Sequence, residues 1–106
     1  MTALSTNPAS TEMGSAETLP LAIDFAPLLV GSETVNGNGA PTSALTDLTD
    51  GSSTAGMLSG SPLVSGTKVQ QTVTGLMPGH RYRLDILIRP VAGKVWNAAL
   101  EIDCPY

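Results

Sequence analysis

The alternation of polar and apolar residues from 81 to 89 is the feature that most restricts the fold. One face of this stretch is apolar and the other is polar: Tyr82, Leu84, Ile86 and Ile88 against Arg81, Arg83, Asp85 and Arg89. A period of two with one apolar face is typical of a β-strand that packs on a core with one face and exposes the other to solvent. The stretch therefore predicts a central antiparallel strand.

A tight turn comes directly before this strand. Pro78 fixes its own φ angle, and Gly79 tolerates a positive φ, which together favour a turn. We therefore expect the chain to swing into the central strand, with Leu76 in the core and Tyr82 closing the corner.

The spacing Leu76-x-Pro78-Gly79-x-x-Tyr82-x-Leu84 resembles the corner before strand F of fibronectin type III and related immunoglobulin-like sandwiches. In those folds the tyrosine hydroxyl bonds back to nearby backbone. The resemblance covers about nine residues. It implies a fold and not a function, because such folds host many functions.

Other segments with strand character recur about every ten residues and are separated by Gly, Pro, Asn and Asp. The expected strand regions are 19–30, 43–48, a short strand into which residues 56–62 lead, 68–74, and 94–103 antiparallel to the central strand. In 43–48 we expect Ala44, and either Leu45 or Leu48, to face inward. The fold predicted is all-β: an immunoglobulin-like (fibronectin type III-like) antiparallel β-sandwich of about seven strands.

The first residues differ from the rest in composition. Residues 1–17 are mainly Ser, Thr, Ala, Asn, Pro and Glu, and have almost nothing to bury. Such a segment does not order by itself. We expect an extended N-terminal arm over residues 1–18, which runs over another subunit, and a sandwich domain over 19–106.

The charge balance restricts the partners. Charged residues make up 13% of the chain, about half the usual share. Such a surface suits a protein packed against neighbours, and equally a loop-rich β-domain alone. The net charge of −4 argues against nucleic acid. Arg81, Arg83 and Arg89 form either a solvated strand face or a contact for an acidic partner surface.

Few features of the sequence indicate the cellular compartment of the protein. Cys104 is the only cysteine, so no intrachain disulfide can form, and a cytosolic assembly site is the default. Residues 1–5 lack the features of a signal peptide, and Pro and Asp interrupt the apolar segment 19–30. We expect a soluble protein with no membrane partner.

The residues that could take part in catalysis or metal binding do not form a complete set in the sequence. His80 is a polar residue of the turn, and Cys104 is a small buried side chain or a bystander. Asp47 and Asp50 could bind calcium but lack further ligands. Trp96 could stack on a sugar, although its phase in the last strand favours the core. No catalytic, cofactor or metal site is expected, which favours a binding or structural module.

The order of several segments is similar to small immunoglobulin-like proteins encoded among the head and tail morphogenesis genes of tailed bacteriophages. The segments are Ile23-Asp-Phe-Ala-Pro-Leu-Leu29, Gly31-x-Glu33-Thr34-Val35, 69–76, Tyr82 and the closing strand. The resemblance spans residues 19–103. It implies a virion component that is assembled in the host cytoplasm, as a homo-oligomer or in many copies, on the major capsid protein or on neck proteins.

Three classes of function remain in view. The first is a capsid decoration (cement) protein on the shell, with a neck, head–tail connector or fibre-attachment module as the alternative within the same class. The second is a fibronectin-like module that binds carbohydrate or a cell surface. The third, an enzyme, lacks the acid–base and nucleophile sets that catalysis needs.

Overall fold

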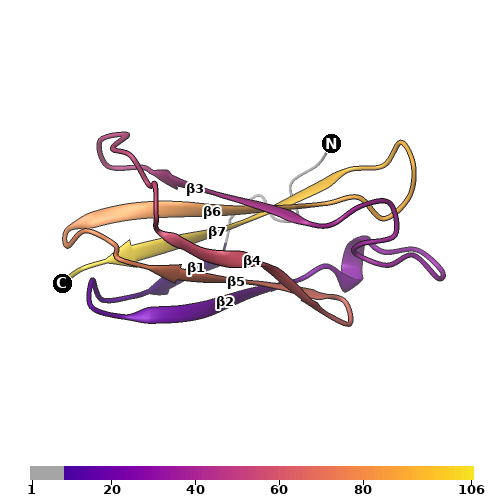
Figure 1. The fold of residues 1–106 in the computed structure, drawn as a ribbon, viewed down its shortest axis with the longest axis horizontal. Coiled ribbons are helices and arrows are strands. Elements are labelled where there is room, and N and C mark those ends of the chain that lie inside the picture. The colour runs from indigo at the N-terminus through magenta and orange to yellow at the C-terminus, as the bar shows by residue number, and fades with distance from the viewer. Residues whose placement is uncertain (1–8) are drawn as a thin grey trace.

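The computed structural model describes residues 9–106 and shows an all-β fold of two sheets (Figure 1). One sheet has four strands in the order β1-β7-β6-β3, and the other has three in the order β2-β5-β4. The strands are β1 (Ala9–Glu12), β2 (Thr18–Asp24), β3 (Thr42–Asp47), β4 (Leu58–Ser65), β5 (Lys68–Thr74), β6 (His80–Ile88) and β7 (Trp96–Cys104). No helix of the described residues is long and apolar enough to cross a membrane.

The expected central strand is confirmed as β6. Its apolar face is fully buried, with no exposed surface on Tyr82, Leu84, Ile86 or Ile88. Strand β7 pairs with it antiparallel from Trp96 to Cys104, as the sequence predicts. The buried residues of both sheets form one hydrophobic cluster, so the two sheets share a single core.

Strand β1 changes the expected boundary of the N-terminal arm. Residues 9–12 pair parallel with β7, from Ala9 beside Leu100 to Glu12 beside Asp103. Met13 follows and is 1% exposed, so the expectation that residues 1–17 have almost nothing to bury is wrong at this position. Backbone pairing at a sheet edge needs no apolar side chain, and this is why composition misplaced the boundary. The first part of the expected arm, residues 1–8, lies outside the described residues.

Two other segments differ in detail from the sequence prediction. The strand expected over 19–30 ends at Asp24, whose Oδ1 accepts a hydrogen bond from the Ala26 N–H at 2.9 Å and starts a short 3₁₀ helix, Ala26–Leu28. In β3, Leu45 is buried but Ala44 is exposed, so the prediction for Ala44 is wrong. Leu45 lies opposite the buried Leu84, which fixes the phase of the strand.

Gln71 is a buried polar residue that ties the two sheets together. Its side chain is 1% exposed, and its Oε1 accepts a hydrogen bond from Ser43 Oγ of β3 at 2.6 Å. Its Nε2 donates to the carbonyls of Ser59 and Gly60 in β4, both at 3.2 Å. These carbonyls lie where the register of β4 shifts between Ser59 and Leu63. The side chain thus satisfies backbone groups that the irregular pairing frees.

Candidate functional site

The residues of the predicted corner lie together before β6. The Met77 N–H donates a hydrogen bond to Tyr82 Oη at 2.9 Å, and Leu76 is 3% exposed in the core. Pro78 leads into Gly79, which has a φ of 81° and donates its N–H to the Cys104 carbonyl at 2.6 Å. Burial raises the pKa of the Tyr82 hydroxyl. The corner therefore connects the entry of β6 to the end of β7.

A titratable cluster lies at the same end of the molecule. His80 Nδ1 is 2.7 Å from Asp47 Oδ2 and 3.8 Å from Asp50 Oδ1. The Asp47 side chain is 1% exposed, and its Oδ1 accepts hydrogen bonds from the N–H groups of Thr49 at 2.8 Å and Asp50 at 3.3 Å. Asp47 thus holds the turn after β3 through one oxygen and the start of β6 through the other.

The two partners of this pair shift each other's titration. The hydrogen bond to Asp47 raises the pKa of His80, and desolvation opposes this only in part. Desolvation by itself would raise the pKa of Asp47. The hydrogen bonds from His80, Thr49 and Asp50 together outweigh it, so that pKa lies below its ordinary value. The cluster therefore favours a charged imidazolium–carboxylate pair.

The same three side chains are the candidate metal ligands. One donor atom from each of Asp47, Asp50 and His80 lies within 4.8 Å of the others. Sequence reasoning considered the two aspartates together but missed His80, which is 33 residues from Asp47. Only the pairing of β3 with β6, which places Asp47 opposite Tyr82, brings the imidazole near. Both Asp47 oxygens already accept hydrogen bonds, so Asp47 holds the turn after β3 against the start of β6.

The structure does not bring the three candidate contact arginines into one positive surface. Arg81 pairs with Glu101 at 2.7 Å, and Arg83 pairs with Asp85 at 3.1 Å. Arg89 follows the far end of β6, about 26 Å along an extended chain from Arg81. On the outer face of the four-stranded sheet, two arginines lie among carboxylates, which are Glu12, Asp85, Glu101 and Asp103.

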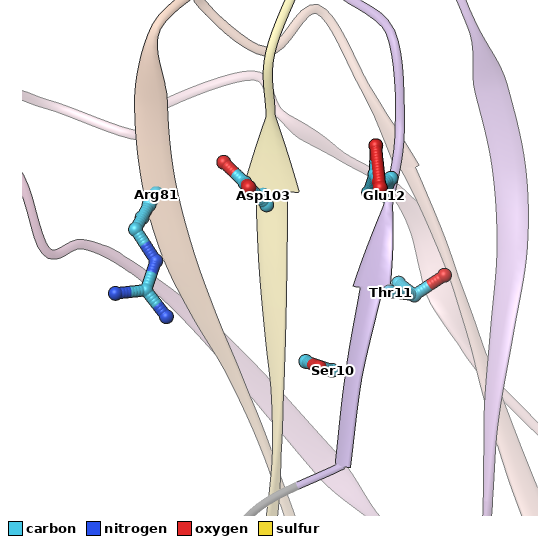
Figure 2. Close-up of a pocket in the computed structure, with 5 residues that line it drawn as sticks. All are labelled: Ser10, Thr11, Glu12, Arg81 and Asp103. Atoms are coloured by element: carbon cyan, nitrogen blue, oxygen red, sulfur yellow. The ribbon is translucent and has the colours of Figure 1, made fainter.

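A shallow hollow of about 580 Å³ lies on this charged outer face. It is lined by Ser10, Thr11, Glu12, Arg81 and Asp103, and Figure 2 shows these side chains on the adjacent strands β1, β7 and β6. Its lining carries carboxylates, hydroxyls and one guanidinium. Small-molecule pockets are mostly apolar and enclosed, so this hollow is a polar depression of the sheet surface.

The two remaining candidate residues pack in or against the core. Cys104 is fully buried, and burial raises the pKa of its thiol, which disfavours the reactive thiolate. Trp96 is half-buried and packs against the hydrophobic cluster. Neither side chain is presented to a ligand in the way that a nucleophile or a sugar-stacking platform requires.

No protein-family model matches the chain, and no curated protein matches it.

Proposed function

We propose that the chain is an immunoglobulin-like β-sandwich that serves as a non-enzymatic structural protein of a tailed-bacteriophage particle. The strand order supports the fold. In such sandwiches strands C, F and G face strands B, E and D. Here β3, β6 and β7 form one sheet and β2, β5 and β4 the other. The hydrogen bond from the Met77 N–H to Tyr82, near the start of β6, supports the fold as well, because such sandwiches have a tyrosine of this kind at the start of strand F.

One observation carries the structural role, and it is the exposure of apolar side chains on β4. Leu63 is 62% exposed and Val64 is 38% exposed, and the strand Leu58–Ser65 has no charged residue. Leu63 is in register with Gln70 on the outer face of the sheet, and Val64 is in register with Val69 on the other face, so apolar area is exposed on both sides of an uncharged edge strand. Such exposure favours contact with another protein. A protein that spends its life in an assembly can keep such a surface, because its neighbours cover it.

Within the virion class, the proposed station is the capsid shell, where the protein acts as a decoration protein that binds the major capsid protein. The sandwich would sit on the shell, and the segment before β1 would reach across neighbouring subunits. A neck, head–tail connector or fibre-attachment module is the alternative, and it makes the same physical demands on the surface. The carbohydrate-binding alternative is disfavoured because Trp96 packs against the core.

Copy counting on purified particles tests this proposal. Quantitative mass spectrometry would give the ratio of this chain to the major capsid protein. A decoration protein is present in a number set by the shell lattice, whereas a neck or fibre module follows the symmetry of a single ring. A copy number equal to the number of subunits in one ring would indicate a neck protein instead. Absence of the chain from mature particles would contradict a virion role altogether.

A further inference from the structure

The two sheets present very different outer faces. Alternation along β2 and β5, with Ile23, Val69 and Val73 buried, places their other side chains outside. We call this surface, together with the residues of β4 in register with it, the neutral face. Its members are Thr18, Pro20, Ala22, Asp24, Lys68, Gln70, Thr72, Thr74, Ser59, Leu63 and Ser65.

Charge is nearly absent from the neutral face. Its only charged residues are Asp24 and Lys68, which lie opposite each other in register at one end and cancel. The chain as a whole has a net charge of −4, so the negative excess lies elsewhere.

On the other sheet Glu12 and Asp103 are adjacent carboxylates. The outer face of that sheet also carries Asp85 and Glu101, and these carboxylates outnumber Arg81 and Arg83. Two copies meeting through it would bring two net negative surfaces together, whereas two copies meeting through the neutral face would not.

Some of the polar groups on and beside the neutral face already have partners within the chain. Thr18 Oγ1 and Thr74 Oγ1 are hydrogen-bonded to each other at 2.7 Å, and Thr67 Oγ1 donates to Asp24 Oδ1 at 2.7 Å. Polar groups that already have partners lose little when water leaves. Leu63 supplies exposed apolar area on the same face.

The strand edges are poorly suited to pairing with another strand through backbone hydrogen bonds, which leaves contact through side chains on a sheet face. Pro20 interrupts the edge strand β2, and β4 carries Pro62 together with its register shift. Along β3, Thr54 Oγ1 donates to the outward carbonyl of Leu45 at 2.7 Å, and β1 is only 4 residues long. Each of the four sheet edges is therefore short, irregular or covered.

We propose that the neutral face is a self-association surface, on which a second copy of this chain packs face to face about a two-fold axis. Two such sheets can stack with their strands aligned, at the spacing of about 10 Å usual for packed sheets. The same small side chains then meet on both sides, as a two-fold contact requires. The proposal holds whether or not the protein belongs to a virion.

Sedimentation velocity of the full chain, over a range of concentrations at physiological salt, tests this contact with two matched variants. Thr72→Glu places a carboxylate on the neutral face of both partners. Thr46→Glu places the same charge on β3, on the outer face of the other sheet and opposite Arg83. The expected result is a parent dimer that Thr46→Glu leaves intact and Thr72→Glu weakens by about tenfold or more in Kd.

The proposal would be overturned by a parent that stays monomeric throughout, or by equal dimerisation of the parent and Thr72→Glu. Equal weakening by both variants would also overturn it, because that effect would come from net charge and not from the face. Circular dichroism melting checks that each variant is folded. If Thr72→Glu does not fold, Gln70→Glu, a nearly isosteric change on the same face, replaces it with the same expected outcome.

Discussion

The hydroxyl of Tyr82 is one oxygen atom on which the entry of β6 depends. It accepts a hydrogen bond from the N–H of Met77, with 2.9 Å between the nitrogen and the oxygen. Met77 follows the buried Leu76. Tyr82→Phe leaves that N–H without its acceptor and should cost about 1–2 kcal/mol of unfolding free energy. Leu76→Ala should cost more, roughly 2–5 kcal/mol, because it opens a cavity in the core. Denaturant midpoints measure both losses, and midpoints equal to the parent's would show that the corner contributes nothing.

His80 gives the fold a pH dependence near neutrality. Its pKa is raised above the ordinary 6.5, so its contribution to stability is complete below that pH and is lost as the pH rises through the raised value. The pKa of Asp47 is lowered from 3.8, so its contribution is complete above 3.8 and is lost as the pH falls through the lowered value. The pair is therefore most stabilising between these limits.

Melting temperatures across the pH range test this dependence. His80→Gln should remove the loss of stability as the pH rises from 6.5 toward 9, because His80 is the only histidine in the chain. A further loss at higher pH should remain in both proteins, because burial raises the pKa values of Cys104 and Tyr82. The loss of stability at acid pH should remain in the variant, since the pKa values of Asp24 and Glu33 are lowered as well. A loss of equal size between pH 6.5 and 9 in the parent and the variant would contradict the prediction.

At the residue scale, the sequence predicts contacts that are close along the chain. The corner from Leu76 to Tyr82 spans seven positions, and its turn chemistry is visible in Pro78 and Gly79. The pairing of His80 with Asp47 joins β6 to the end of β3, and no local pattern encodes it. Gln71 appears in the sequence as one more inward position of an alternating strand. Its role as a tie between sheets depends on Ser43 and on the shifted register of β4.

The strands themselves show the same division between local and distant information. The strands β5, β6 and β7 are predictable because their side chains alternate in a clean period of two. Strand β1 has no such pattern. It exists because β7 offers it a partner edge, and because Met13 enters the core just after it. A four-residue edge strand of this kind becomes evident only when its neighbour is known.

Two truncations separate the role of β1 from that of the segment before it. Removing residues 1–8 keeps β1 and Met13, so the melting temperature should stay close to the parent's while incorporation into particles falls. Removing residues 1–17 deletes the strand and a core side chain, and should lower the melting temperature as well. Normal occupancy of particles without residues 1–8 would move the binding surface to the folded domain.

For the whole molecule, we predict that folding does not depend on divalent metal ions. The Asp47 oxygens are already occupied by two backbone N–H groups and by the imidazole of His80. A cation would have to displace these contacts. Calcium or zinc at sub-millimolar concentration should therefore leave the melting temperature unchanged. A rise of several degrees would show instead that Asp47, Asp50 and His80 act as ligands.

The parallel pairing of β1 with β7 determines how the domain would respond to tension. These are the first and the last of the described strands, and they lie side by side in the same direction (Figure 1). A pull on the start of β1 and the end of β7 acts along the ladder, so its hydrogen bonds are strained together in shear and are not opened one by one. Force spectroscopy between residues 9 and 106 should show one abrupt rupture, which a variant without β1 should lose. Resistance to a pull of this direction would suit a protein held between neighbours that move apart.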